Sequence, residues 1–327
     1  MINVGIIGSG FIVAPFIEAT KLAKGFRYVG IAARNEEKLK AVKEKYDISY
    51  YSTNNDDVIN DPKIDVIYVA VPNGTHYEIA KKALMAGKHV IMEKPFTPTY
   101  KEAKELIDLA KKKNLIIFDA VTLLHMPNYK KAKEIVEELG DIKMVDLNFS
   151  QYSSRYDKFK KGIVLPAFDT KHAGGALMDL GIYNLDFVMG IFGVPKKLQY
   201  FPNIHKGIDT SGVLVLDYGK FKVNSIAAKD CRAPMNICIQ GDKGYLKCDY
   251  ASSLITVIRH VNNAGEAKEY RLNKHEECAH YHEYMEFKRL VKENDLEKAQ
   301  EYNEFTLKSI KVLEKAIASG NIKFKTK

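Results

Sequence analysis

The first 120 residues of the chain alternate short β-branched runs with longer stretches of helical periodicity. Strands are expected at residues 3–7, 28–32, 66–70, 89–92 and 116–120. Helices are expected at residues 11–24, 35–46, 77–86 and 100–113, where apolar residues recur at helical spacing. Apolar strands that alternate with helices in this way form a parallel sheet covered on both faces. The pattern therefore predicts an α/β fold with a doubly wound parallel sheet over residues 1–122.

The pattern changes after about residue 124. Helices are expected at residues 128–139, 176–192, 279–292 and 297–319. Strand-like runs lie at residues 144–152, 197–201, 212–217, 222–228, 236–240, 245–249 and 254–259. Hairpin-type turns such as Tyr218-Gly219 separate several of them. Residues 123–327 are therefore predicted to form a second, α+β domain, with a mostly antiparallel sheet and helices on one face.

Composition and charge argue against several other classes of protein. The four cysteines are too few for a disulfide framework in 327 residues, which favours a reducing, cytoplasmic location. The net charge of +9 comes from lysines that alternate with acidic residues, and no helix-turn-helix, zinc finger or basic arm is recognisable. No apolar run approaches the roughly 20 residues that span a bilayer, and the N-terminus lacks a basic leader. We therefore expect neither a nucleic-acid nor a membrane partner.

A glycine-rich turn follows the first predicted strand, where residues 4–12 read VGIIGSGFI. The first glycine of such a turn makes it tight, and the second lets the backbone approach a pyrophosphate, which the helix N-terminus attracts. The residues expected to bind a dinucleotide here are Gly8, Ser9, Gly10, Phe11 and Ile12. Val13 takes the place of the usual third glycine and is expected to push the helix slightly away from the sheet.

The end of the second strand distinguishes between the two nicotinamide cofactors. NAD-binding folds place an acidic residue there for the ribose 2′-hydroxyl, but this chain has Ala33-Arg34 and no acid. A guanidinium matches a 2′-phosphate in bidentate geometry, so NADP is the preferred cofactor. Alternatively, Arg34 stacks on the adenine, in which case NAD is also possible.

Two further segments follow later strands of the same predicted sheet. Pro72-Asn73-Gly74-Thr75-His76 comes after the strand at 66–70, and Glu93-Lys94-Pro95 comes after the strand at 89–92. Ligands of open α/β sheets bind beyond the carboxyl ends of the strands. The residues assigned to the cofactor site on this basis are Pro72, Asn73, His76, Glu93 and Lys94. The alternative for Lys94 is a surface ion pair with Glu93.

These segments, together with Gly174-Gly175-Ala176-Leu177-Met178-Asp179 and Tyr183, resemble the glucose-fructose oxidoreductase / inositol dehydrogenase (Gfo/Idh/MocA) family. They occur in the family's order and spacing. The resemblance implies a Rossmann domain, a C-terminal domain with a large open sheet, and homodimers or homotetramers built on that sheet. It also implies that Lys94, Asp179 and Tyr183 surround the reacting carbon.

Tyr183 stands where inositol dehydrogenase-like members carry histidine. The chain is in this respect more similar to the branch of dimeric dihydrodiol dehydrogenase and NADP-dependent xylose dehydrogenase, where the tyrosine is thought to act as acid/base. Asp179 and Tyr183 are four residues apart, which places both on one helical face. A free tyrosine has a pKa of about 10, and a nearby ammonium favours its phenolate. Lys94 would hold the substrate oxygen and Asp179 would orient that lysine or a second hydroxyl. The alternative is that Tyr183 is a core tyrosine.

Several residues are weaker candidates for contact with a substrate. Residues 119–128 read DAVTLLHMPN and depart from the family's Glu-Ala-x-x-x-Arg pattern, so Thr122, His125 and Asn128 either face the substrate or are structural. Tyr156, in the loop ahead of the later helix, could line the same pocket. One further cluster, His275, Cys278, His280 and His282, lacks a second ligand pair, and we expect no metal site there.

The sequence thus predicts a dehydrogenase or reductase that moves a hydride between NAD(P) and a carbinol or carbonyl carbon of a sugar, polyol or diol-like molecule. One alternative is a non-catalytic regulator of the same fold that binds a dinucleotide as a signal. Another is a sugar-processing enzyme that uses the cofactor only transiently.

Overall fold

The computed structural model describes residues 1–275 and 278–325, and its contacts divide the chain into two units. The first comprises Met1–Ala120 and Glu277–Ile310, and the second comprises Val121–Glu276 and Lys311–Lys327. The sequence predicted a single boundary between residues 122 and 123. The structure instead returns α9 (Tyr281–Glu293) to the first unit, where it packs against α1 (Val13–Ala23).

The first unit is built on a six-stranded sheet with the order β3-β2-β1-β4-β5-β6, and every pairing in it is parallel. Its strands are β1 (Ile2–Ile7), β2 (Phe26–Ala32), β3 (Tyr50–Ser52), β4 (Val66–Val69), β5 (His89–Met92) and β6 (Ile117–Asp119). The predicted doubly wound parallel sheet is thereby confirmed. The sequence missed β3, because three residues are too short for a periodic signal.

Helices connect these strands, and local capping explains where two of them begin. The helices are α1, α2 (Glu36–Tyr46), α3 (Asn55–Ile59), α4 (His76–Met85), α5 (Tyr100–Lys112) and α9, and α10 (Leu296–Ser319) begins here. The Asn35 side chain accepts a hydrogen bond from the Lys38 amide at the start of α2. Thr99 accepts one from the Glu102 amide at the start of α5. These caps satisfy backbone donors that a helix N-terminus leaves unpaired.

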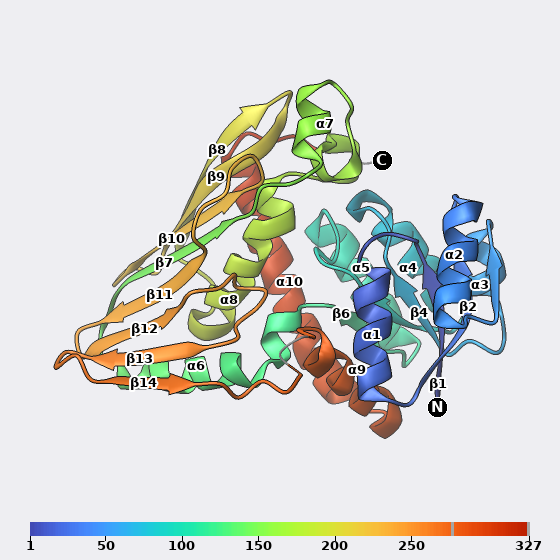
Figure 1. Cartoon of the computed structure of the whole chain (residues 1–327), viewed down its shortest axis with the longest axis horizontal. Coiled ribbons are helices and arrows are strands. Elements are labelled where there is room, and N and C mark those ends of the chain that lie inside the picture. The colour runs from blue at the N-terminus through green and yellow to red at the C-terminus, as the bar shows by residue number, and fades with distance from the viewer. Residues whose placement is uncertain (276–277, 326–327) are drawn as a thin grey trace. The chain divides into compact units, whose positions relative to one another are not determined.

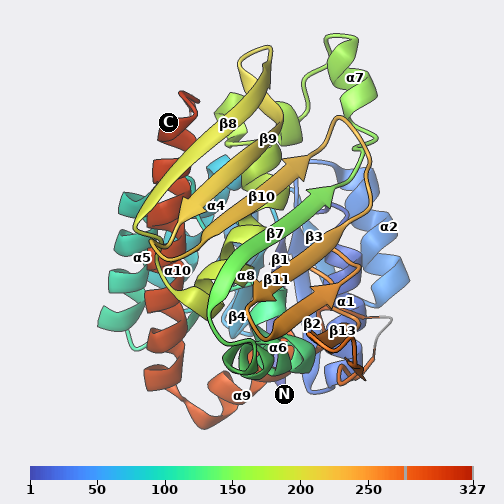
Figure 2. The ribbon, with the colours of Figure 1, turned by 90° about the vertical axis from the view of Figure 1, so that its left-hand side faces the viewer.

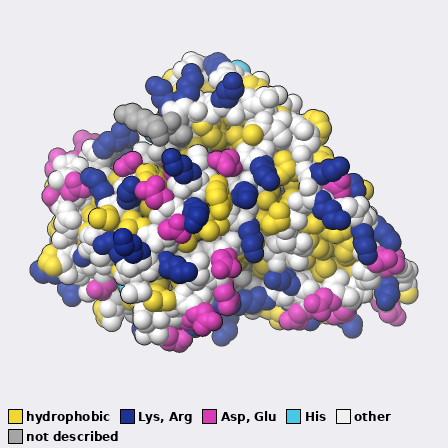
Figure 3. Space-filling view, turned by 180° about the vertical axis from the view of Figure 1, so that it is seen from behind, with side chains coloured by type: hydrophobic (Ala, Val, Ile, Leu, Met, Phe, Trp, Pro, Cys, Tyr) yellow, Lys and Arg dark blue, Asp and Glu magenta, His cyan; other side chains and the backbone are white. Residues whose placement is uncertain are grey.

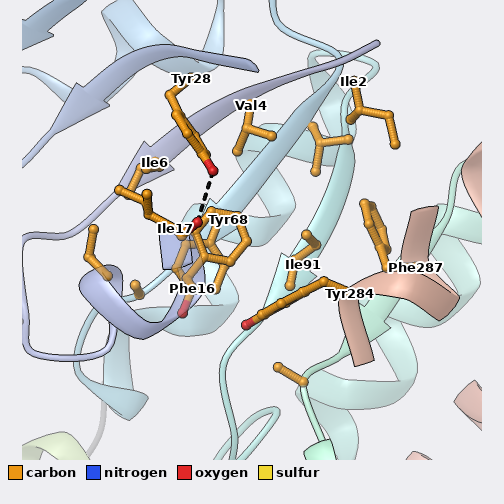
Figure 4. Close-up of a cluster of buried hydrophobic side chains, with 14 of the residues drawn as sticks. Ile2, Val4, Ile6, Phe16, Ile17, Tyr28, Tyr68, Ile91, Tyr284 and Phe287 are labelled. Carbon is orange, nitrogen blue, oxygen red and sulfur yellow. Dashed lines mark hydrogen bonds between the residues drawn. The ribbon is translucent and has the colours of Figure 1, made fainter. Parts of the chain in front are cut away.

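The core of the first unit explains why α9 belongs to it (Figure 4). The rings of Phe16 and Tyr68 stack with their centroids 3.8 Å apart, and Tyr284 of α9 meets Phe16 edge-on at 4.9 Å. Phe287, one turn further along α9, packs against Phe118 at 5.5 Å. Burial of two aromatic rings from α9 stabilises this unit by the hydrophobic effect.

The second unit is built on an eight-stranded sheet with the order β14-β13-β12-β11-β7-β10-β9-β8 (Figure 1). Its strands are β7 (Ile142–Ser150), β8 (Lys197–His205), β9 (Ile208–Asp217), β10 (Lys222–Ala228), β11 (Asn236–Gly241), β12 (Gly244–Cys248), β13 (Ile258–Asn262) and β14 (Ala267–Tyr270). The central pair β7–β10 is parallel and the other pairs are antiparallel. The predicted large, mostly antiparallel sheet is confirmed. The run predicted at 254–259 was misplaced, since β13 begins at Ile258, and β14 was missed.

One face of this sheet carries the helices of the second unit, and the other lies open (Figure 2). Its helices and helical turns are η2 (Thr122–His125), α6 (Pro127–Glu138), α7 (Tyr156–Lys160), η3 (Pro166–Phe168), η4 (Thr170–His172), η5 (Leu177–Gly181) and α8 (Ile182–Phe192), with the end of α10. Alternate side chains of the strands, Met144, Phe201 and Tyr245 among them, are exposed, whereas their neighbours Val145, Tyr200 and Leu246 are buried. This alternation is expected of a sheet with one covered face.

The segment Thr170–Phe192 has the length and apolar composition of a membrane span. This corrects the expectation that no apolar run reaches that length. However, 72% of its most apolar window is buried inside the protein, which is typical of a core helix.

Candidate active site

The turn after β1 has the geometry that a dinucleotide-binding loop needs. Gly8 adopts a φ of 124°, and a Cβ atom at this position would clash with the carbonyl oxygen of Ala70. No other residue fits this conformation and this close approach. At Gly10, by contrast, a Cβ would meet nothing within 4 Å, so the backbone here is open to a ligand. The helix α1 then begins at Val13, which is buried in the core.

The residues beside this turn differ in their surroundings. Phe11 is 81% exposed, whereas Ile12 packs against the core of the first unit. Arg34 follows β2 and is exposed, and its side chain forms neither a hydrogen bond nor an ion pair within the described residues. Its neighbours Asn35 and Glu36 are engaged, since Asn35 caps α2 and Glu36 pairs with Lys40 at 3.1 Å. The guanidinium therefore remains available for an anionic ligand.

His76 joins the two segments that follow β4 and β5. Its Nε2 atom lies 2.9 Å from the carbonyl oxygen of Val71, and its Nδ1 atom lies 3.1 and 3.2 Å from those of Pro95 and Phe96. The ring is fully buried, and this burial lowers the pKa of His76 against the opposing effect of the three carbonyls. Since backbone oxygens lie against both ring nitrogens, His76 fixes the positions of the loops that carry Asn73 and Lys94.

Glu93 is also held inside the protein. Its Oε1 atom accepts a hydrogen bond of 2.6 Å from the hydroxyl of Tyr68, which projects from β4. Burial raises the pKa of Glu93, and the carboxylate of Glu283 adds to the rise. The carboxyl group thus belongs to the packing behind the strand end, while the next residue, Lys94, is half-buried. Glu93 is therefore buried, so the ion pair considered as the alternative for Lys94 would not lie on the surface.

In the second unit, a buried aspartate fixes the start of the segment that carries Asp179. Asp209, on β9, accepts hydrogen bonds of 2.8 Å from the Leu177 amide and from the Tyr200 hydroxyl. A Cβ on Gly175, whose φ is 109°, would clash with the other carboxylate oxygen of Asp209. Burial raises the pKa of Asp209. The second glycine of the sequence motif, Gly175, is therefore required by a carboxylate more than thirty residues away, which the sequence analysis missed.

The predicted helix over 176–192 begins with a π-helical turn, η5, and continues as α8. Such turns are rare and often mark functional sites. Asp179 lies in the π turn and Tyr183 lies one turn later, with its half-buried ring 5.9 Å from that of Phe149. Tyr183 packs at the edge of a small apolar cluster that includes Ala176 and Ala227.

The structure adds a residue that the sequence analysis did not consider. The Nζ atom of Lys229 lies 2.7 Å from Oδ2 of Asp179 and donates a 2.8 Å hydrogen bond to the carbonyl oxygen of Ala167. It also lies 4.6 Å from the centre of the Phe168 ring. Lys229 follows the apolar strand β10, and a lysine at the end of a buried strand is the signal that could have identified it.

The weaker substrate candidates lie in the second unit and are mostly buried. Thr122 and His125 belong to η2. The side-chain amide of Asn128 donates to the carbonyls of Ile255 and Thr256, and its oxygen accepts from the Leu272 amide. These contacts occupy the side-chain amide of Asn128 and favour the structural one of its two alternatives.

Tyr156 packs in an aromatic cluster with Phe159, Phe168 and His205, at centroid distances of 5.7 to 6.3 Å. This gives Tyr156 a packing role in the segment ahead of η5.

Among the residues that the structure describes, no group of three or more His, Cys, Asp or Glu side chains is arranged to hold a metal ion. From the cluster considered above, His280 contacts Glu283 at 3.4 Å.

Family models match most of the chain. Residues 2–120 match the Gfo/Idh/MocA oxidoreductase family with its NAD-binding Rossmann fold. Residues 129–247 match the Gfo/Idh/MocA C-terminal domain.

Among curated proteins, the chain is 29% identical over 321 residues to the scyllo-inositol 2-dehydrogenase (NADP+) IolU of Bacillus subtilis, covering 97% of this chain and 96% of that protein. It is 28% identical over 251 residues to the trans-1,2-dihydrobenzene-1,2-diol dehydrogenase of Xenopus tropicalis, covering 74% of each.

Solved structures share the fold at lower identity. The 3-ketoreductase KijD10 of Actinomadura kijaniata, in complex with NADP and TDP-benzene, superposes with a TM-score of 0.85 at 20% identity, covering 97% of each chain. A levoglucosan dehydrogenase, in complex with NADH and levoglucosan, superposes with a TM-score of 0.83 at 18% identity, covering 98% of this chain and 97% of that one.

Proposed function

Since the chain belongs to the Gfo/Idh/MocA family of NAD(P)-dependent oxidoreductases, we propose that it is a dehydrogenase or reductase of a sugar, polyol or diol-like molecule. The hydride would move between nicotinamide C4 and a carbinol or carbonyl carbon of the substrate. The observation that carries this proposal is the ion pair of Lys229 with Asp179, which lies one turn before Tyr183 in the following helix. A protein that only sensed a dinucleotide would not need this set of residues.

The backbone of the first unit has the features that a dinucleotide cofactor requires. The open turn at Gly10 and the N-terminus of α1 suit a pyrophosphate, and Ala33 and Arg34 would lie at the adenosine ribose. Pro72, Asn73 and Lys94 would lie towards the nicotinamide end, supported from behind by His76 and Glu93. The residues proposed to line the pyrophosphate are Gly8, Ser9, Gly10, Phe11 and Ile12. The bound nicotinamide would supply or accept the hydride.

The exposed guanidinium of Arg34 supports NADP as the preferred cofactor. It can donate in a bidentate manner to a 2′-phosphate, and the residues that end β2 and follow it directly, Ala32-Ala33-Arg34, include no acid to hold a ribose hydroxyl. The alternative is that Arg34 stacks on the adenine, in which case the protein would bind NAD as well as NADP.

Three side chains would act on the substrate. Tyr183 would exchange the proton of the reacting oxygen through its phenolic oxygen, and Lys94 is proposed, from the family resemblance, to donate a hydrogen bond to the substrate. Asp179 would accept a hydrogen bond from a second hydroxyl of the substrate. Thr122 and His125 are proposed as further pocket residues.

The activity can be tested directly by NADPH absorbance with purified protein, NADP+ or NAD+, and three compounds: scyllo-inositol, trans-1,2-dihydrobenzene-1,2-diol and levoglucosan. Turnover of a compound in the wild type, lost in Tyr183→Phe, would support the proposal. Cofactor binding without turnover of any sugar, polyol or diol would favour a dinucleotide-binding regulator. A bound cofactor that is recycled without net NADPH formation would favour transient redox chemistry.

We also propose that the protein is cytoplasmic and forms a homodimer or homotetramer through the open face of its large sheet. That face exposes the apolar side chains of Met144, Phe201 and Tyr245. Basic and acidic side chains are interspersed on the surface seen in Figure 3, which argues against a nucleic-acid partner. Light scattering would give the oligomer size, and Phe201→Lys should shift it towards the monomer.

A further inference from the structure

We propose that Lys229 is a positioning residue of the reaction, which holds Asp179 as the acceptor for a substrate hydroxyl. This inference rests on the proposed function. It assigns a role to a residue outside the Lys94–Asp179–Tyr183 set, and it arises from contacts within the second unit alone.

The two partners of this ion pair differ in their access to solvent. The side chain of Lys229 is 1% exposed, whereas that of Asp179 is 34% exposed. A substrate can therefore reach the carboxylate but not the ammonium. Lys229 lies on the buried side of Asp179, so any effect of Lys229 on a reaction passes through Asp179.

The ammonium is held in one place by three different groups. It contacts the Asp179 carboxylate at 2.7 Å and the Ala167 carbonyl at 2.8 Å, and it faces the Phe168 ring at 4.6 Å. A buried ammonium needs such partners, because its desolvation costs several kcal/mol. The buried carboxylate of Asp209 provides a further charge of opposite sign nearby.

The backbone on either side of Lys229 is equally constrained. Its amide donates to the carbonyl of Thr210 on β9 at 2.8 Å, and its carbonyl accepts from the amide of Ser153, just after β7, at 2.9 Å. The Ala167 carbonyl that binds Nζ also accepts a hydrogen bond from the Gly175 amide at 3.1 Å. The lysine thus ties the sheet to the turn from which η5 begins, and fixes the direction of the Asp179 side chain.

A carboxylate held in this way can only accept hydrogen bonds. It favours substrates with a second hydroxyl group near the reacting carbon, as in a polyol or a diol, over simple alcohols. Displacement of such a group by even 1 Å can lower turnover by about 100-fold.

A double-mutant cycle separates this role from a purely structural one. The variants are Lys229→Met, Asp179→Asn and the combination, assayed on whichever of the three compounds above the wild type turns over. Lys229→Met should lower kcat by about 10- to 100-fold with little change in NADPH affinity. In the Asp179→Asn background the same substitution should change kcat less than about threefold.

Lys88→Met is the matched control. Lys88 is also a buried lysine, and its Nζ donates to the carbonyls of Asp61 and Ile64 at 2.7 Å, but it belongs to the first unit. Lys88→Met should lower the melting temperature without a comparable loss of kcat. Lys229→Arg, which retains the cation, should recover part of the activity lost in Lys229→Met.

Equal losses of kcat from Lys229→Met in both backgrounds would overturn the proposal, since the lysine would then not act through Asp179. Coupling in the unfolding free energy without coupling in kcat would overturn it too, and would leave a structural ion pair. If Lys229→Met does not fold, Lys229→Gln replaces it in the double-mutant cycle, and the coupling in kcat with Asp179→Asn is judged in the same way. A wild type that turns over no sugar, polyol or diol would refute the proposed function itself.

Discussion

The hydroxyl of Tyr68 donates a 2.6 Å hydrogen bond to the buried carboxyl group of Glu93. The contact joins β4 to the end of β5, directly before Lys94. A charged acceptor inside the protein depends strongly on such a bond, because no water replaces it. The position of a proposed catalytic lysine is therefore tied to a hydrogen bond between two side chains of the core.

Tyr68→Phe should destabilise the protein by about 1.5–3 kcal/mol at neutral pH, the usual value of a hydrogen bond to a charged group. Burial raises the pKa of Glu93 in the folded protein, so Glu93 contributes most to stability below its pKa in the unfolded chain, and this contribution is lost as the pH rises through its pKa in the folded protein. At mildly acidic pH the carboxyl group is more often protonated, and the hydrogen bond from Tyr68 then no longer stabilises a buried charge. The loss of stability in Tyr68→Phe should therefore be smaller at mildly acidic pH than at neutral pH. Denaturant unfolding at both pH values measures it. Tyr46→Phe is the control, since the buried Tyr46 hydroxyl has no hydrogen-bond partner among the described residues.

Tyr183→Phe should lower kcat by about 100-fold or more, because general acid–base catalysis contributes about 10²–10⁴ to rates. The ring still fills its place beside Phe149, so the melting temperature and the NADPH affinity should change little. Steady-state kinetics and a fluorescence titration with NADPH give both quantities. Wild-type turnover in the variant would reassign Tyr183 to the core.

Arg34→Ala should weaken NADPH binding by about 10- to 100-fold and leave NADH binding nearly unchanged. The reason is the loss of charge-assisted hydrogen bonds to a 2′-phosphate, each worth about 1.5–3 kcal/mol. Titrations of both cofactors against both proteins test this. Equal affinity of the wild type for NADH and NADPH would instead make Arg34 a residue that stacks on adenine.

Gly175→Ala should destabilise the protein by more than about 2 kcal/mol, because it combines an unfavourable φ of 109° with a clash against Asp209. Gly193→Ala provides the comparison, since Gly193 also has a positive φ, 76°, but a Cβ there would meet nothing within 4 Å. Its cost should be confined to the roughly 1–3 kcal/mol of a residue in a backbone region that is essentially restricted to glycine, and should be smaller than that of Gly175→Ala. Similar melting temperatures for the two variants would show that Asp209 moves aside.

Much of the first unit could be predicted because its signals are local. Strand and helix periods, the Gly8–Gly10 turn and the strand-end segments at His76 and Lys94 are each readable within a dozen residues. The family was likewise evident from short motifs, and the matches to both of its domains confirm it. Arg34 as a determinant of NADP preference remains a prediction.

The errors share a different cause, which is distance along the chain. Nothing near residue 284 indicates that Tyr284 and Phe287 complete the core around Phe16, so the return of α9 was missed. The structural role of Asn128 could not be recognised from the sequence, because its partners, the loops at Ile255 and Leu272, lie far away along the chain.

The sequence by itself determined the periodic elements, the phosphate-binding turn and the family, since these depend on residues that are neighbours along the chain. Only the tertiary structure determined which charged side chains contact one another. Lys229 and Asp179 are separated by fifty residues, and Asp209 on β9 accepts a hydrogen bond from the Leu177 amide at the start of η5. Buried charges find partners wherever packing brings opposite groups together, and packing depends on the whole fold.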